Sequence, residues 1–545
     1  MPAEEVDVPR TAAGVPYDAK AARNMLVVLA LMALMVTYVE TMVLPAFKSF
    51  VQFFDNAPAT TVVWIVSSYL LVGTVATPVF GKLGDKYGKK RMLLLVMGLY
   101  AVAVSLAGFS PNIGAALGLD RAHQIYVLIA IRAFQGLGMG MFPLAFAMIP
   151  EVFPAARVGQ AQGIVSGMFA AGASLGLVGG GYISYEYGWQ LTYHTVIPIS
   201  VTLAVVAYFI LRESPHLHPA PLDIPGISSL GFALAMAMFG VTEGTYWGWA
   251  NFDSVHWGAL SWGVPEFFLL ALAGTTFFAL WEPHARNPVV SFAALRQRNI
   301  LISNVNGVLV GVGMFLIFVA MVILIEDPFT PGFNLDEFQM GLVALPASLS
   351  MLALAPLWGR WVAAKGPRPV MAGGFAIMAF GALGLTFLNS NIYELMLFQI
   401  PALAGNVAVL IAMSNIIVLS VPPKELGIQT GMNQTFRNVG SAIGPVIAAT
   451  ATASWTTAVL VARPPVGPPI FAQVPSLFGF QFIFELTAAV ATLGLVLSLG
   501  LRNYRFRADG TRTETHAREE AKASPPASSA GPISPRGAAP ASAEP

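Results

Sequence analysis

Long apolar runs recur along almost the whole of this 545-residue chain. A helix that crosses the hydrocarbon core of a bilayer needs about 20 mostly apolar residues. We count fourteen such runs, at roughly residues 25–46, 61–81, 91–109, 124–147, 162–186, 194–212, 227–246, 264–282, 299–326, 338–364, 369–388, 391–419, 429–453 and 477–501. Only 10% of the residues are charged, whereas soluble domains carry about 25%. A soluble core could not bury this much apolar surface. The sequence therefore predicts an all-α integral membrane protein with fourteen transmembrane helices.

Lys and Arg gather in the connections on one side of the predicted bundle. Cytoplasmic loops of membrane proteins hold an excess of these residues. If the N-terminus lies in the cytoplasm, the outer connections keep only Lys48, Arg121 and Arg463, and the other loop cations fall on cytoplasmic connections. An even number of helices returns the C-terminus to the same side. We therefore expect a multi-pass protein of the plasma (bacterial inner) membrane with both termini in the cytoplasm.

The chain also repeats itself. GKLGDKYG, residues 81–88, and GRWVAAKG, residues 359–366, share glycines seven apart at the end of an apolar run. The stretch GIVSGM, residues 163–168, matches GIQTGM, residues 427–432, and at the same offset Gly176 meets Gly440 and Gly180 meets Gly444. Parallel repeats that hold a substrate site at their interface are a known transporter design. We therefore expect two pseudo-symmetric six-helix bundles with two linker helices between them. The predicted divisions are a cytoplasmic segment (1–23), a first bundle (24–212), two extra helices with linkers (213–298), a second bundle (299–505) and a disordered cytoplasmic tail (506–545).

Four stretches in order carry a family resemblance. They are GKLGDKYGKKR at residues 81–91, RAFQGLG at 132–138, GASLGLVGGG at 172–181, and GVTEGTYWGW at 240–249 followed by WEPHARNPVVSFAALRQRNI at 281–300. Together they resemble the fourteen-helix drug:proton antiporter branch of the major facilitator superfamily, over roughly residues 20–505. The resemblance implies a multidrug exporter that works by alternating access and takes part in antibiotic resistance.

The first of these stretches is predicted to form a conformational latch. The resemblance implies that Asp85 lies over the N-terminus of the thirteenth helix, near Gly427, where the helix dipole favours a carboxylate. Lys89 and Arg157 are then placed to pair with Asp85 and Glu151. Such a latch would hold the two halves together on the cytoplasmic face in the outward-open state. The alternative is that the cations only set topology. The expected latch residues are Gly81, Asp85, Gly88, Lys89, Glu151 and Arg157.

Ionisable residues inside the predicted spans are candidates for proton coupling or substrate contact, because burying a charge in the bilayer is costly. Glu40 is a proton-carrier candidate on physical grounds, since it lies off the position of the acid in the family's first helix. The resemblance implies coupling by Arg132, with Gln135 one turn later on the same face. Arg437 either lines the translocation path or binds the latch. Structural alternatives stay open: a Glu40 bonded to a neighbouring helix and an Arg132 that reaches the interface.

Small residues form two packing stripes. Gly172, Gly176 and Gly180 recur every four residues, so they share one helix face and permit close approach of another helix. The family has a proline after the second glycine, where this chain has Leu177, which weakens the antiporter inference. The second half does carry one, in the set Gly440, Gly444 and Pro445.

The remaining features narrow the function by exclusion. The net charge of +1 argues against nucleic-acid binding, and the chain has no cysteine and no spacing typical of a metal site. No phosphate-binding glycine loop is present, so we expect an ion gradient to supply the energy. We expect no cofactor, no metal and no enzyme activity. The expected partners are protons, a small-molecule substrate and the lipid bilayer, while the oligomeric state stays open, a monomer included.

The sequence thus predicts proton-coupled antiport of lipophilic or cationic drug-like compounds. The alternative is export of one endogenous compound, such as a metabolite, a siderophore or a lipid precursor. A membrane-embedded enzyme is a less favoured alternative, because the charges are scattered instead of clustered at one depth. A non-transporting sensor is also less favoured, because the short tail offers no sizeable folded appendage.

Overall fold

The computed structural model describes residue 11 and residues 16–214, 221–250, 255–257, 260–286, 288–329, 331–421, 426–462, 470–506 and 512–514. Within these ranges, thirteen helical segments are long and apolar enough to cross a membrane. The helix α18 (Leu426–Ser454) has 29 residues, long enough for a fourteenth span, but a row of amide side chains lowers its hydropathy. The protein is therefore the predicted membrane bundle of helices, with a few short strands.

The first bundle contains the helices up to residue 210. Two of its spans are interrupted, the first at Pro45 and the fourth at the glycines of residues 136–140, so each is built from three pieces. The elements are α1 (Ala19–Thr41), η1 (Leu44–Ala46), α2 (Phe47–Phe53), α3 (Ala59–Val62), α4 (Trp64–Tyr87), α5 (Lys89–Gly108), α6 (Ser110–Ala116), α7 (Gln124–Gln135), η2 (Gly136–Gly140), α8 (Met141–Val152), α9 (Ala155–Tyr187) and α10 (Trp189–Ile210).

The linker region and the second bundle follow. The linker holds α11 (Ile224–Trp247), β1 (Val255–Trp257), β2 (Leu260–Trp262), α12 (Val264–Trp281), η3 (Glu282–His284) and α13 (Phe292–Leu295). The second bundle holds α14 (Arg298–Glu326), α15 (Glu337–Lys365), α16 (Pro367–Phe387), α17 (Ile392–Ser420), α18, β3 (Thr456–Ala462), β4 (Ile470–Pro475) and α19 (Leu477–Leu499), and the strands β5 (Tyr504–Phe506) and β6 (Arg512–Glu514) come last.

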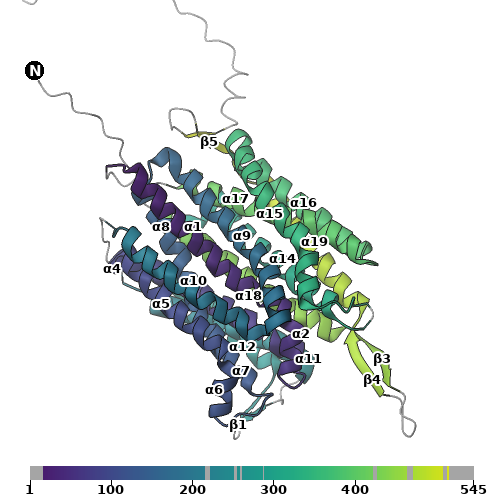
Figure 1. Ribbon diagram of the computed structural model, residues 1–545. Coiled ribbons are helices and arrows are strands. Elements are labelled where there is room, and N and C mark those ends of the chain that lie inside the picture. The colour runs from purple at the N-terminus through teal and green to yellow at the C-terminus, as the bar shows by residue number, and fades with distance from the viewer. Residues whose placement is uncertain are drawn as a thin grey trace, which may run out of the picture.

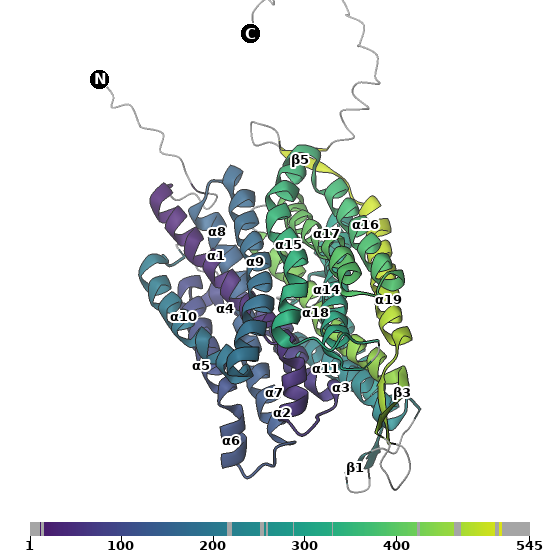
Figure 2. The same ribbon diagram turned by 45° about the vertical axis from the view of Figure 1, so that its right-hand side comes forward.

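The two bundles lie side by side with their helices running roughly parallel to one another (Figure 1). In the turned view, α1, α5 and α10 lie on one side and α14, α15, α16 and α19 on the other (Figure 2). We call the end at which α1 begins and β5 lies the near end, and the opposite end, with α2 and α6, the far end. Each six-helix group thus forms one lobe of the molecule.

Corresponding helices pack in the same way in both halves. In the first half α9 packs along α1, and in the second half α18 packs along α14. Between the halves, α9 packs against α15 and α18 packs against α4. These are the fifth and second long helices of opposite halves, so the internal repeat seen in the sequence corresponds to a repeated packing arrangement.

Two glycines of the sequence repeat turn the chain at the near end. Gly88 follows α4 with a φ of 103°, and Gly366 follows α15 with a φ of 85°. Residues with a side chain rarely adopt this backbone region. The repeat GKLGDKYG and GRWVAAKG therefore ends, in both halves, on a glycine that the turn between two antiparallel helices requires.

The two extra helices lie against one flank of the bundle interface. α11 packs against both α4 and α18, and α12 packs against α11. Trp64 stacks on Phe239 with ring centroids 4.6 Å apart, and the Thr450 hydroxyl donates to the Val241 carbonyl at 3.2 Å. The linker helices therefore contact one helix from each half at the same time.

The ends of the chain differ in part from the expectation. The tail was predicted to be disordered from residue 506, but the described residues 504–506 and 512–514 pair as the antiparallel strands β5 and β6. Their backbones satisfy each other's hydrogen bonds, which a compositional argument does not foresee. The rest of the predicted tail and most of the predicted segment 1–23 lie outside the described residues.

Candidate functional site

Glu40 lies in the last turn of α1, just before Pro45 interrupts the first span. Its side chain is only 3% exposed, and its Oε2 atom has no hydrogen-bond partner. The charges of Arg437 and Arg132 both act on this carboxyl group. The structure therefore brings three of the four predicted coupling residues, one from each of α1, α7 and α18, into one electrostatic group.

Arg132 is the largest fully buried side chain of the first bundle. Its Nε donates to the Ile65 carbonyl at 2.9 Å, and its Nη1 donates to the Gln135 Oε1 at 2.8 Å. The guanidinium also lies over the Tyr69 ring, 4.6 Å from its centroid. Gln135 is thus the fourth predicted residue, and it contacts Arg132 as the spacing of three residues on a helix requires. Arg132 does not reach an interface.

Arg437 lines a pocket between the halves. Its side chain is 6% exposed and its guanidinium lies over the Phe169 ring, 4.5 Å from the centroid. The Gln434 amide, oriented with its oxygen toward the guanidinium, accepts from Arg437 Nε at 3.2 Å. Arg437 therefore lines the pocket and also acts, through its charge, on the buried Glu40 carboxyl.

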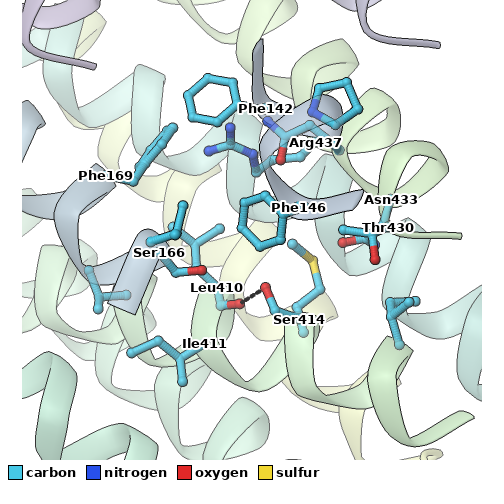
Figure 3. A pocket seen from close by; sticks show the side chains of 16 residues that line it. Phe142, Phe146, Ser166, Phe169, Leu410, Ile411, Ser414, Thr430, Asn433 and Arg437 are labelled. Carbon is cyan, nitrogen blue, oxygen red and sulfur yellow. Dashed lines mark hydrogen bonds between the residues drawn. The ribbon is translucent and has the colours of Figure 1, made fainter. Parts of the chain in front are cut away.

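The pocket is formed by α8 and α9 of the first half and α17 and α18 of the second (Figure 3). It contains about 750 Å³ of space, a figure that includes its open mouth. Arg437 is the only ionisable residue among its sixteen lining residues, most of which are apolar. Figure 3 shows the rings of Phe142, Phe146 and Phe169 around the guanidinium. This arrangement suits an apolar or aromatic molecule with few polar groups.

Two hydroxyl groups of the pocket, those of Ser166 and Ser414, are turned toward their own helices. The Ser166 hydroxyl donates to the Gln162 carbonyl, and the Ser414 hydroxyl donates to the Leu410 carbonyl. The dashed line in Figure 3 marks the second bond. Each hydroxyl oxygen can then act only as an acceptor toward a bound molecule. Arg437 is the one charged donor among the lining residues.

The glycine stripes lie at the closest helix contacts. A Cβ atom at Gly172, Gly176 or Gly180 would overlap atoms of α1 or of the residue that follows it. In the second half a Cβ at Gly440 would overlap the Val308 carbonyl of α14, and Gly444 lies against the same helix. Pro445 lies inside α18 directly after Gly444. Both stripes fix the position of a pocket-lining helix.

The predicted latch residues form a network within the first half. Lys89 Nζ lies 2.5 Å from Glu151 Oε1 and 3.8 Å from Asp85 Oδ1. Arg157, expected to pair with a carboxylate, donates instead to the Tyr17 hydroxyl at 3.3 Å. Gly81 lies against Pro143. The expected partner region of Asp85 includes residues 422–425, which lie outside the described residues, so the latch between the halves stays a prediction.

Several polar contacts that join the halves were not expected from the sequence. Asn438 Nδ2 donates to Thr77 Oγ1 at 3.2 Å, between α18 and α4. At the far end, the Lys48 amide donates to Glu326 Oε2 at 3.1 Å, between α2 and α14. Glu326 is the last residue of one predicted span, and Glu337 directly precedes the next. Acids at the ends of spans are usually exposed to water. Only the packing of α2 onto Glu326 and Glu337 shows that these two are buried.

A family model described as Major Facilitator Superfamily matches residues 29–324 and again residues 304–538. The tetracenomycin C resistance and export protein of Streptomyces glaucescens is 26% identical over 72% of this chain and 69% of its own length. The multidrug transporter protein MdtP of Bacillus subtilis is 24% identical over 72% of this chain and 68% of its own.

Solved structures show the same fold. The xylose transporter XylE from E. coli, in a partially occluded inward-open conformation, superposes with a TM-score of 0.59 and 12% identity, over 88% of this chain and 98% of that one. Together with two six-helix lobes and a pocket between them, the family match over most of the sequence shows that this chain belongs to the major facilitator superfamily.

Proposed function

We propose that this protein is a secondary exporter that exchanges protons for lipophilic or cationic drug-like compounds by alternating access. The observation that carries the proposal is the link from Glu40 through Arg437 to the pocket. A buried carboxyl that can take up a proton lies within electrostatic reach of the guanidinium that lines the candidate substrate site. Glu40 is the proton carrier, and Arg132 and Arg437 control its charge.

The sign of the coupling limits the substrates that can be exchanged. When Glu40 is ionised it offsets the Arg437 charge beside the pocket. When a proton neutralises Glu40, the positive charge of Arg437 is no longer offset. A proton thus weakens the binding of a cation and strengthens the binding of an anion. Because antiport requires that proton and substrate exclude each other, the arrangement supports cationic or uncharged lipophilic substrates. An anion would instead be carried together with the proton.

Orientation follows from the charges of the loops. The near end carries Lys89, Lys90, Arg91, Arg212 and Lys365, so we place it in the cytoplasm, together with both termini. The far end, which faces outward in this placement, is closed by contacts between the halves. Tyr182 of α9 and Phe338 of α15 meet with ring centroids 5.4 Å apart. The pocket residues on α8, α9, α17 and α18 are then reached from the cytoplasm, where an exporter collects its substrate.

The test uses purified full-length protein in proteoliposomes, with ethidium as an aromatic cation and fluorescein as an organic anion. An acid-inside pH gradient should drive ethidium uptake by the wild type and should not drive fluorescein uptake. Glu40→Gln should abolish the gradient-driven part while the protein still folds as judged by gel filtration. Glu243→Gln, which changes an acid in the linker helix α11, is the matched control and should keep the uptake.

Two outcomes would contradict the proposal. If ethidium uptake by the wild type does not depend on the pH gradient, the proposal of proton antiport is wrong. Gradient-driven uptake that is unchanged in Glu40→Gln would remove Glu40 from the coupling and leave antiport to another residue.

A second candidate is the export of one endogenous compound. The relative from Streptomyces glaucescens is named for resistance to and export of a single compound, tetracenomycin C. A deletion strain separates the two functions. A multidrug exporter predicts sensitivity to several unrelated compounds, and a dedicated exporter predicts the loss of one metabolite from the medium.

A further inference from the structure

Two buried glutamates that act on each other electrostatically lie at the far end, outside the pocket and outside the coupling group. Glu326 is the last residue of α14 and Glu337 is the first residue of α15, and their side chains are 3% and 5% exposed. Both belong to the second half, and both lie against the first half. Glu326 accepts from the Lys48 amide of α2, while the hydroxyl groups of Ser49 in α2 and Ser184 in α9 lie beside the Glu337 carboxyl.

Each carboxyl keeps one oxygen without a hydrogen-bond partner. These atoms are Glu326 Oε1 and Glu337 Oε2, and both are inaccessible to solvent. The two carboxyl groups are close enough for their charges to repel each other. Two like charges that share a buried site cannot both ionise without a large cost, so one proton is favoured on the pair.

The charged groups around the pair offset little of the repulsion between the two carboxylate charges. From α2, the Lys48 Nζ donates to Asn334 Oδ1 at 3.3 Å, so this cation is engaged at the rim. The loop adds Asp327 and the start of α15 adds Asp336, both negative, and α9 presents the neutral Ser184. Burial raises the pKa of Asp327 above its usual range. The surroundings therefore favour a protonated pair as long as the halves stay together at this end.

We propose that Glu326 and Glu337 form a second proton-binding site, which closes the far end of the transporter when it holds a shared proton. When the halves separate at this end, water reaches both carboxyl groups and the proton leaves to the same side from which it came. The site is therefore a gate set by the pH of the far-side compartment, and its proton is not carried across. This inference rests on the proposed alternating-access export.

The test measures closure directly and needs no substrate. The chain has no cysteine, so Tyr182→Cys and Phe338→Cys place two unique labelling sites on opposite halves at the far end. Pulsed EPR of spin labels on the full-length protein in nanodiscs gives the ratio of closed to open molecules. If closure binds one additional proton, the ratio should rise about tenfold for each unit of pH decrease within the titration range.

The variants separate the pair from other acids at the same end. Glu326→Gln with Glu337→Gln mimics two neutral carboxyl groups, and we expect a closed far end with no pH response. Glu186→Gln, which changes an exposed acid of α9 at this end, should keep the tenfold response. A double variant that still responds to pH like the parent would overturn the proposal, as would a parent with no response.

A transport measurement covers the case in which the double variant folds poorly. Each single variant, Glu326→Gln or Glu337→Gln, should transport ethidium with a weaker dependence on far-side pH at a constant pH gradient. An unchanged dependence in both would contradict the gate. Because the EPR ratio does not depend on transport, a wild type that carries no ethidium but closes on acidification would contradict the proposed function and leave the gate standing.

Discussion

Asn438 and Thr77 join the two halves of the transporter through a hydrogen bond of 3.2 Å between α18 and α4. Both side chains are fully buried, and the Thr77 hydroxyl donates onward to the Gly73 carbonyl. The bond therefore forms only while α4 and α18 pack together, and it stabilises the conformation in which these two helices are in contact.

Replacing Thr77 with Val should destabilise this state. The methyl group keeps the volume but removes the acceptor, so the Asn438 amide loses its partner. In soluble cores an unsatisfied buried group costs about 1–3 kcal/mol, whereas such bonds inside membranes average about 0.6 kcal/mol. We expect the lower value, seen as a small fall of Tm in detergent. The double variant Thr77→Val with Asn438→Leu should recover part of the loss, and a fully additive pair would contradict the coupling.

Gly176→Ala should destabilise the first bundle, although alanine is the better helix former. A Cβ at Gly176 would overlap the Thr41 hydroxyl and the Tyr38 carbonyl of α1, and backbone atoms move aside only at a cost. Overpacking of this kind costs about 1–3 kcal/mol. Gly167→Ala is the control on the same helix, because no atom lies within 4 Å of the Cβ added there. Thermal unfolding should show a lower Tm for the first variant alone.

The fold was largely predictable from the sequence because each span carries its own signal. Apolar runs of sufficient length gave the predicted helices, and the predicted span 429–453 agrees closely with α18 in spite of its polar residues. The strands β3 and β4 were not expected, because their pairing is set by contacts between segments and not by either segment alone.

The candidate site was less predictable. Glu40, Arg132 and Arg437 attracted attention as charges inside apolar runs, but their meeting depends on which helix faces come together. Nothing in the sequence distinguishes the pocket residues Phe142, Phe146 and Phe169 from phenylalanines that face lipid. The burial of Glu326 and Glu337 was not predicted either, because acids at the ends of spans are usually solvated.

The ion pair of Lys89 with Glu151 should contribute more than an exposed pair. Their side chains are 12% and 13% exposed, and Ser214 also donates to Glu151. Lys89→Met leaves a largely buried carboxylate without its partner, so we expect a larger loss of stability than in Lys89→Met with Glu151→Gln. The exposed pair of Arg212 with Asp18 is the control, with a coupling energy below about 1 kcal/mol. Equal coupling energies in the two double-mutant cycles would contradict this prediction.

Phe169→Leu should weaken the binding of aromatic substrates more than it slows transport. Leucine keeps the apolar character of the pocket but removes the ring that lies over the Arg437 guanidinium, 4.5 Å away. A cation–π contact contributes about 0.5–2 kcal/mol, so the position of Arg437, and with it the pocket wall, should become less defined. We expect KM for ethidium to rise about 2- to 30-fold, the range that this energy allows, with little change in kcat. Phe169→Tyr keeps the ring and is the matched control, and a KM that rises equally in both variants would show that shape, not the ring over Arg437, is what the pocket requires.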